Sequence, residues 1–314
     1  LDPTVHRISI MKSSRVGFTK SITLIPIGYF MHHDPRSVLV LLPRESDAEK
    51  FSKNELAPML RDVPVLRGLV NERSRDSDST LLEKHYPGGV IHMGGANSSR
   101  VFRQLTASIA ICEESSDYPP SAGGQGDPVK LAERRTGDAW DHKLVEVSSP
   151  NLVGSCRITK SYAESDQRRF FVPCPHCDHG QFLQWGGKEF DFGFKWESGK
   201  PETVYYLCEH CHCEIQERSR GWMVDEGNYE ATQPDGAWPG FHIWAAYSPL
   251  PDAAWPRLVT EFREAGNDPY LLQVFENTIK GQAWENKGNA PRESALMERR
   301  ESYPMRGTGA VLPS

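Results

Sequence analysis

The chain has 314 residues, a formal net charge of −6 at pH 7 and a sequence isoelectric point of about 6.0. This length allows two lobes, and the acidic balance means that any contact with nucleic acid must use local basic patches. The sequence has no signal-peptide pattern and no apolar run approaching the ~20 residues of a membrane-spanning helix, so we expect no membrane partner. It opens at Leu1 rather than at Met, and we expect a fragment of a longer protein.

The first half of the sequence alternates apolar strands with helical segments. Apolar runs predict strands over residues 6–11, 38–42, 90–93, 108–112 and 144–147. The segment 22–30 is apolar, and 47–60 has helical spacing behind a Ser46 cap. This alternation predicts an α/β fold in which crossover helices join the strands of a mostly parallel central sheet.

The second half contains two clear helical patterns. Residues 255–265 and 269–280 carry their apolar side chains at helical spacing, and each segment is predicted as a helix. The segments 119–127 and 226–240 are predicted as loops from their composition, and 286–314 as a polar linker.

Four of the seven cysteines form two C-x-x-C units, Cys174 with Cys177 and Cys208 with Cys211. This pattern predicts one tetrahedral zinc site with four thiolate ligands, because each unit offers two sulfurs to the metal. A structural role for the zinc is favoured over direct DNA contact, for which the nearby candidates are Arg168, Arg169, Lys188, Lys195, Trp185 and Trp196. Cys112 and Cys156 are expected to be buried, and Cys213 to be a free thiol.

A loop from Lys12 to Lys20 joins the first strand to the apolar segment. This is the setting of a phosphate-binding loop, in which backbone N–H groups and a helix N-terminus hold phosphate oxygens. Phe18 stands where such loops carry lysine, and Thr19 takes the Mg²⁺-ligand position. Lys12 or Lys20 could supply the missing charge, and we favour Lys12. The loop alone also fits an ordinary strand-to-helix turn.

Carboxylates and hydroxyls end two of the other predicted strands. Glu113 and Glu114 follow the strand at 108–112; in motor ATPases the first acid of such a pair holds Mg²⁺ and the second polarises the attacking water. Ser148 and Ser149 follow the strand at 144–147, at the edge of a parallel sheet where nucleotides bind. Taken alone, these strand ends also fit solvated acids and a simple turn.

In this order the loop, the acid pair, the Ser148-Ser149-Pro150 turn and the cysteine units resemble one family, the large terminase subunit of tailed bacteriophages of the lambda-like type. The resemblance covers nearly the whole chain. It also rests on the strings GGANS (94–98), DPVKLAERRT (127–136), GFHIWAAYSP (240–249) and FENTIKGQAWE (275–285).

The resemblance implies a P-loop NTPase core of the RecA/ASCE type over 1–170, a zinc ribbon over 171–225, a helical lid over 226–300 and a linker over 301–314 to an absent nuclease domain. It implies an ATPase that uses ATP, Mg²⁺ and Zn²⁺ and translocates double-stranded DNA into a procapsid. The implied partners are this DNA, the small terminase subunit and the portal protein, with a homo-oligomer as the active form and the host cytoplasm as its location. No nuclease activity is expected from this chain.

The resemblance also assigns roles to single residues. Glu114 matches the catalytic glutamate, Lys12 the lysine at the start of a variant phosphate loop, and Ser148-Ser149-Pro150 the motif that couples hydrolysis to movement. The nucleotide-binding positions are Lys12, Ser13, Ser14, Arg15, Val16, Gly17, Phe18, Thr19, Lys20, Glu113, Ser148 and Ser149. Candidates for a charge-stabilising arginine are Arg15, Arg100 and Arg103, although each is favoured as a surface or structural residue.

Two alternative functions stay open at this point. A zinc-stabilised DNA-docking scaffold with an inactive nucleotide site is favoured by Phe18 and by the absence of the family's N-terminal adenine-contacting segment. A helicase-like enzyme of the same sheet class is disfavoured, because the sequence shows no second motor domain.

Overall fold

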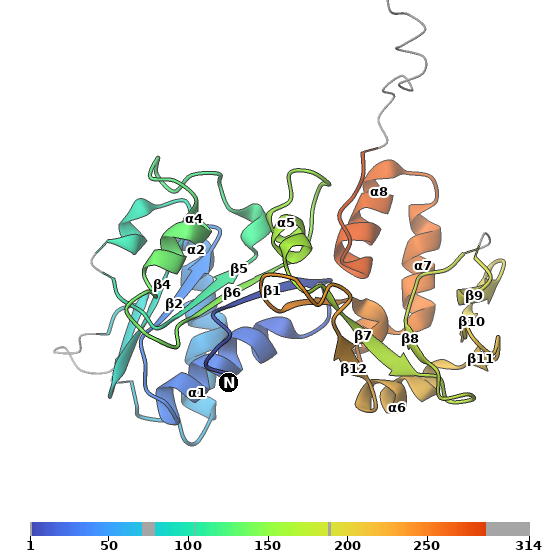
Figure 1. The fold of residues 1–314 in the computed structure, drawn as a ribbon, viewed down its shortest axis with the longest axis horizontal. Coiled ribbons are helices and arrows are strands. Elements are labelled where there is room, and N and C mark those ends of the chain that lie inside the picture. Colours follow the sequence, from blue (N-terminus) through green and yellow to red (C-terminus); the bar gives the residue numbers. More distant parts are fainter. Residues whose placement is uncertain (1, 71–78, 104, 188–189, 287–314) are drawn as a thin grey trace, which may run out of the picture. The chain divides into compact units, whose positions relative to one another are not determined.

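The computed structural model describes residues 2–70, 79–103, 105–187 and 190–286 (Figure 1). The predicted linker beyond residue 286 and the candidate Lys188 lie outside these ranges. Residues Leu1–Trp284 form one unit, and Glu285–Ser314 form a second, of which only Glu285 and Asn286 are described. No helix within the described ranges is long and apolar enough to cross a membrane.

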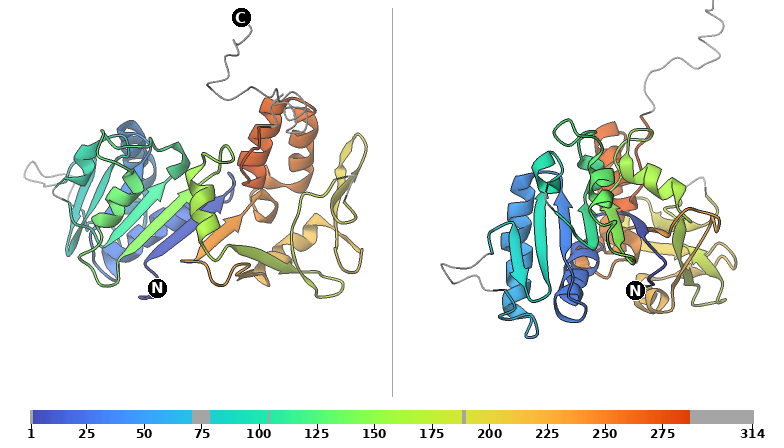
Figure 2. Two further views of the ribbon diagram at one scale, coloured as in Figure 1. Left: turned by 45° about the horizontal axis from the view of Figure 1, so that its top comes forward. Right: turned by 60° about the vertical axis from the view of Figure 1, so that its left-hand side comes forward.

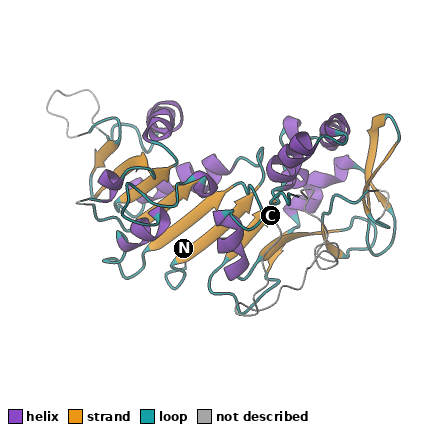
Figure 3. Ribbon diagram, turned by 90° about the horizontal axis from the view of Figure 1, so that it is seen from above, coloured by secondary structure: helices purple, strands orange, loops and turns teal. Residues whose placement is uncertain are grey.

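A ten-stranded, mostly parallel sheet runs through the first unit (Figure 3). Its strands are β1 (Arg7–Lys12), β2 (Val38–Leu42), β3 (Glu83–Tyr86), β4 (Gly89–Gly95), β5 (Ile109–Glu113), β6 (Lys143–Ser148), β7 (Arg168–Pro173), β8 (Gly180–Phe182), β12 (Asn228–Glu230) and β13 (Gly240–Ile243). The strand order is β12-β7-β13-β1-β6-β5-β2-β4-β3, with β8 paired to β7. Strands β3, β8 and β12 are antiparallel to their neighbours, and the other pairings are parallel.

The helices follow the strands in chain order. They are α1 (Ile25–His32), preceded by a π-helical segment Thr19–Leu24; α2 (Glu45–Phe51) and α3 (Ala57–Asp62), joined by the π-helical Ser52–Leu56; α4 (Pro128–Arg134); α5 (Arg157–Glu164); α6 (Arg220–Asp225); α7 (Trp255–Ala265); and α8 (Pro269–Val274), continued by Phe275–Lys280. Because the β1-to-α1 connection and the other crossovers keep the strands parallel, the carboxyl ends of β1, β5 and β6 lie at one edge of the sheet.

Helices cover both faces of the sheet (Figure 2). Helices α1, α2 and α3 pack with Val38 and Val40 of β2 on one face, and α4 packs with Leu39 and Leu41 on the other. Successive strand residues point to opposite faces, so a strand that is covered on both sides needs apolar residues at every position. This explains the unbroken apolar run over 38–42.

A second, three-stranded antiparallel sheet belongs to the predicted ribbon: β9 (Gly193–Glu197), β10 (Lys200–Leu207) and β11 (Glu214–Ile215). Its core is aromatic, with the rings of Phe194 and Trp255 packed edge to face at 4.9 Å. Trp185 packs on Phe275 at 4.7 Å and, like Trp196, lies partly buried against this core. Both tryptophans therefore contribute to the packing of this core.

The predicted strands and the two C-terminal helices are confirmed within about two residues. The Ser46 cap is wrong: α2 starts at Glu45 after an extended Arg44, which places Ser46 inside the first turn. The loop predicted over 226–240 contains β12, which pairs with β7, and the segment predicted as a lid supplies β13 beside β1. Cys112 and Cys156 are buried, as expected.

Candidate nucleotide site

Lys12 is the last residue of β1, and its side chain is largely buried at the carboxyl edge of the sheet. Its Nζ lies 2.8 Å from Oε1 of Glu114, which follows β5. Strand β6 lies between β1 and β5, so the ion pair spans the end of β6. The fold thus brings together two of the predicted site residues that are far apart in the sequence.

Glu114 has a left-handed backbone conformation, with φ 52° and ψ 47°, which is unusual for a residue with a side chain. Its Oε2 accepts hydrogen bonds from the Ser148 hydroxyl at 3.3 Å and from the Ser149 N–H at 3.2 Å. Both carboxylate oxygens of Glu114 are therefore engaged, one by Lys12 and the other by the predicted coupling turn.

Glu113 lies next to this group and is buried at the end of β5. Burial raises the pKa of its carboxyl, and a hydrogen bond from the Thr23 hydroxyl together with the nearby Lys12 charge opposes that rise. Thr19, the predicted Mg²⁺-ligand position, lies one helical turn before Thr23. The sequence interpretation missed Thr23, although the i, i+4 spacing from Thr19 was a usable signal.

The loop after Lys12 is hydrogen-bonded to the segment near the end of the described chain. Ser13 N–H donates to the Ile243 carbonyl at 3.0 Å, and Ser14 N–H donates to the Thr278 carbonyl at 2.8 Å. At Gly281, an added Cβ would lie 2.8 Å from Ser13 N, so only glycine fits against the loop here. The Ser14 N–H, one of the predicted phosphate donors, is thus already paired in this conformation.

Arg15 is held in the same way and has a positive φ of 64°. Its Nη1 donates to Oε1 of Glu261 at 2.6 Å and to the Asp252 carbonyl at 2.8 Å, while the Ser248 hydroxyl donates to its carbonyl at 2.6 Å. These contacts hold Arg15 in the loop, and its part in nucleotide binding or in charge stabilisation stays a prediction.

The other loop residues are more accessible. Val16, Phe18 and Thr19 are half-buried, and Gly17, with φ 72°, is exposed at the turn into the helix. Lys20 is exposed on the first turn of the π-helical segment, whereas Lys12 is buried beside the acid pair. Of the two candidate lysines, Lys12 is the one in contact with Glu114.

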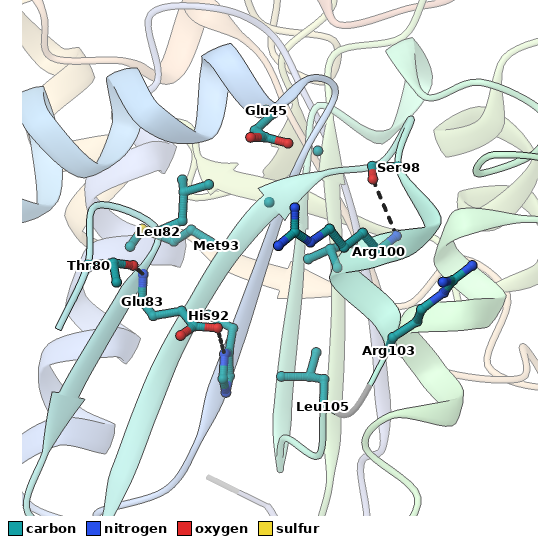
Figure 4. A pocket seen from close by; sticks show the side chains of 13 residues that line it. Glu45, Thr80, Leu82, Glu83, His92, Met93, Ser98, Arg100, Arg103 and Leu105 are labelled. Carbon is teal, nitrogen blue, oxygen red and sulfur yellow. Dashed lines mark hydrogen bonds and ion pairs between the residues drawn. The ribbon is translucent and has the colours of Figure 1, made fainter. Parts of the chain in front are cut away.

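Three of the remaining cationic candidates have local partners. Arg168 contacts Asp166 at 2.7 Å, Arg169 lies over the Phe182 ring at 5.1 Å, and Lys195 donates to the Gly187 carbonyl at 2.6 Å. Arg100 and Arg103 line a cavity of about 450 Å³ at the carboxyl end of β4, with Glu45, Glu83 and His92 (Figure 4). Arg100 extends across this cavity in Figure 4.

The four predicted cysteine ligands form one cluster. Their sulfurs all lie within 4.8 Å of one another, with Cys174 to Cys211 at 3.8 Å and Cys177 to Cys208 at 3.9 Å. The first cysteine of each unit accepts a hydrogen bond from the backbone N–H two residues on, at 3.4 Å in both cases. The residue after each unit, Asp178 or His212, has a positive φ. The two units therefore have the same backbone geometry around a common centre.

Comparison with known proteins decides the family. A family model of the ATPase domain of the phage terminase large subunit gpA matches residues 1–229, which is more than half of the chain. The chain belongs to this family. The resemblance inferred from the motifs is confirmed, and residues 1–229 are a terminase ATPase domain by sequence. None of these findings supports the inactive scaffold considered above.

Two terminase large subunits illustrate the relationship. The chain is 34% identical over 322 residues to the one of Enterobacteria phage P21 and 31% identical over 325 residues to the one of Escherichia phage lambda, and each alignment covers 95% of the chain. The chain spans about half the length of these relatives, 49% and 50%. Among solved structures, a variant of the large terminase ATPase domain of Thermus phage P74-26 matches with a TM-score of 0.47 at 11% identity, over 90% of both chains.

A second model of the same terminase family corrects one expectation. The endonuclease domain of gpA matches residues 238–312, so the prediction that this chain stops before the nuclease domain was wrong. The first part of the matched segment is not separated from the rest of the fold. β13 pairs with β1, and Phe275 and Ile279 belong to the core that contains Trp255, so no domain boundary marks where the matched segment begins. Among the described residues, the four cysteines are the one group of three or more His, Cys, Asp or Glu that could hold a metal ion.

Proposed function

We propose that this chain hydrolyses ATP as the motor portion of a terminase that moves double-stranded DNA into a procapsid. The observation that carries the proposal is the convergence of Lys12, the Glu113–Glu114 pair and Ser148 at one edge of a parallel sheet, next to a strand-to-helix loop. Nucleotides bind at this edge in open α/β sheets. Membership in the terminase ATPase family supports the same reaction.

In this proposal Lys12 neutralises the phosphates and Glu114 polarises the water that attacks the terminal phosphoryl group. The two groups bind each other at 2.8 Å, so Lys12 must exchange the carboxylate for phosphate oxygens when ATP enters. The exchange leaves Glu114 with Ser148 and Ser149 and with one oxygen free to accept a proton from water. Ser14 N–H must likewise leave the Thr278 carbonyl before it can donate to a phosphate.

Magnesium fits the oxygen ligands at the end of β5. Glu113 is a carboxylate adjacent to the Thr23 hydroxyl, and hard cations such as Mg²⁺ take oxygen ligands of these kinds. Glu113, with Thr19 or Thr23, would hold the ion, which neutralises charge on the phosphates when bound. Burial raises the pKa of Glu113, and a cation bound beside it would oppose this rise and favour the ionised carboxylate.

The cysteine cluster fits zinc. Sulfurs at the corners of a tetrahedron with Zn–S bonds of ~2.3 Å lie about 3.8 Å apart, close to the 3.8 and 3.9 Å separations found here. Cys174, Cys177, Cys208 and Cys211 would hold the ion, and the matching N–H to sulfur bonds suit thiolate ligands. We assign the zinc a structural role, because Cys174 and Cys208 belong to the buried core of this lobe.

The partners follow from the family and are part of the proposal: double-stranded DNA, the small terminase subunit and the portal of the procapsid, with a homo-oligomer acting in the host cytoplasm. The test is ATP hydrolysis by the purified chain with Mg²⁺, with and without linear double-stranded DNA. We expect hydrolysis that increases with DNA. ATP binding without hydrolysis, with and without DNA and with the small subunit added, would overturn the proposal.

A further inference from the structure

Glu146 is a fully buried carboxylate in the middle of β6, and the proposed reaction gives it no task. Both of its oxygens are paired: Oε1 accepts from the Ser115 hydroxyl at 3.0 Å, and Oε2 accepts from Nη2 of Arg7 at 3.1 Å. A buried carboxylate is unfavourable unless it is paired and hydrogen-bonded. Its presence between Val145 and Val147 therefore calls for a function that an apolar residue could not fill.

The contact to Ser115 points to that function. Ser115 is itself fully buried and directly follows Glu114, whose left-handed conformation is unfavourable for a residue with a side chain. Such a conformation persists only where the surroundings enforce it. Two side chains of β6 hold the turn after Glu114: Glu146 accepts from Ser115 Oγ, and Ser148 Oγ accepts from the Ser116 N–H at 3.1 Å.

Arg7 on β1 keeps the Glu146 charge in place. Its Nη2 also donates to the Ser161 hydroxyl at 3.2 Å, and its guanidinium lies 4.1 Å from the centre of the Trp238 ring. Ser161 in turn contacts Ser9 at 2.6 Å. These contacts fix Arg7 between the sheet and α5. Arg7 in turn orients the Glu146 carboxylate, and this carboxylate holds the turn that follows β5.

We propose that Glu146 is a positioning residue, which through Ser115 enforces the left-handed turn that aims the Glu114 carboxylate at Lys12 and Ser149. The proposal rests on the catalytic role given to Glu114 above. Glu146 does not itself face the nucleotide edge, because its two oxygens are used by Ser115 and Arg7. It should therefore affect the rate of hydrolysis and leave the affinity for ATP unchanged.

The experiment compares Ser115→Ala, Glu146→Gln and Glu114→Gln with the wild-type chain, and Ser52→Ala is the matched control, because Ser52 is also buried and its hydroxyl donates to the Leu81 carbonyl at 2.6 Å. Ser115→Ala removes the link with the smallest change in volume, so it remains informative if Glu146→Gln fails to fold. We expect Ser115→Ala to lower kcat about tenfold or more, to change the Kd for ATP less than about twofold and to leave Tm close to that of the control.

Amide hydrogen exchange provides a readout that does not depend on turnover. In Ser115→Ala and in Glu146→Gln, exchange over residues 114–118 should rise about tenfold, while exchange over β1 stays as in the wild type. Unchanged exchange at this turn, or an unchanged kcat in Ser115→Ala, overturns the positioning role. If Glu114→Gln hydrolyses ATP normally, the proposed function fails instead. An inactive Glu114→Gln beside a fully active Ser115→Ala rejects the positioning role alone.

Discussion

The Lys12 ammonium and the Glu114 carboxylate form an ion pair at 2.8 Å across the end of β6. The Lys12 side chain is 8% exposed and that of Glu114 is 40% exposed, so the two partners are not equivalent. Glu114 can turn to water at little cost, whereas Lys12 would be left as a buried, unpaired charge. A phosphate group that replaces the carboxylate gives Lys12 a new partner of opposite charge. The Lys12–Glu114 pair is therefore the state that the proposed nucleotide site takes without ATP.

The first prediction concerns the two lysines of the loop. Lys12→Ala should weaken ATP binding by roughly 2–5 kcal/mol, because it removes a buried charge-assisted contact to phosphate. Lys20→Ala is the matched control: it removes an exposed lysine from the same loop and should change the Kd less than about fivefold. The measurement is equilibrium binding of ATP with Mg²⁺. The reverse ranking would move the phosphate loop one frame downstream, to 14–21.

The second prediction concerns the clamp on Arg15. Glu261→Gln should weaken ATP binding by a few-fold, because the Arg15–Glu261 pair supports a backbone conformation that arginine does not favour. Arg257→Ala is the control, since Arg257 contacts the same Glu261 at 3.6 Å from a more exposed position. Equal effects of both variants on the Kd would mean that the Arg15–Glu261 contact has no special part in supporting the loop, and would contradict the prediction.

The third prediction is that the chain binds one zinc ion per molecule through its four clustered cysteines. Cys208→Ser should lose the metal and lower Tm by about 10 °C or more, because zinc binding contributes to the folding of the lobe. Cys213→Ser, two residues beyond Cys211 and outside the cluster, should keep both metal and Tm. Elemental analysis of the purified variants decides. A zinc-free wild type, or zinc loss in both variants, contradicts the assignment.

The fourth prediction is a pH dependence of stability from His242. Burial lowers the pKa of this histidine from 6.5 to about 4, and its Nε2 lies 3.1 Å from the Gly281 carbonyl. The unfolded chain then binds the proton more tightly than the folded one, so this contribution is present above pH 6.5 and is lost as the pH falls towards 4. The loss should approach about 3 kcal/mol in the free energy of unfolding.

Denaturant unfolding at pH 7.5 and pH 5 measures this effect when wild type is compared with His242→Gln. Glutamine cannot take up a proton, so the variant should lose less stability between the two pH values than the wild type. The difference between the proteins cancels the contribution of the cysteines and of other titrating groups. Identical pH profiles would mean that His242 is not the buried group responsible.

Much of the fold was predictable from local patterns. The strand at 38–42 and the helix at 255–265 were predicted with the bounds found in the structure, because each is fully determined by its own apolar spacing. The short strands β12 and β13 were missed, since neither has a long apolar run and both depend on neighbours in the sheet. The Ser46 cap failed because the chain enters α2 from an extended Arg44.

The candidate site was predictable where neighbouring residues define it. The cysteine units and the Glu113–Glu114 pair are local motifs, and the structure brings their members together. Thr23 and Glu146 were missed, because each acquires its role from a partner that is distant in the sequence, Glu113 for Thr23 and Ser115 for Glu146. The usable signal for Glu146 was its position as an acid between Val145 and Val147.

The most direct test of the account is the Glu114→Gln variant, assayed for ATP binding and for hydrolysis. Glutamine keeps the shape of the side chain and removes the charge that polarises water, so hydrolysis should fall by about a hundredfold or more. Binding should be at least as tight as in the wild type, because Lys12 no longer has a competing carboxylate. A Glu114→Gln protein that hydrolyses ATP at the wild-type rate would contradict the central claim.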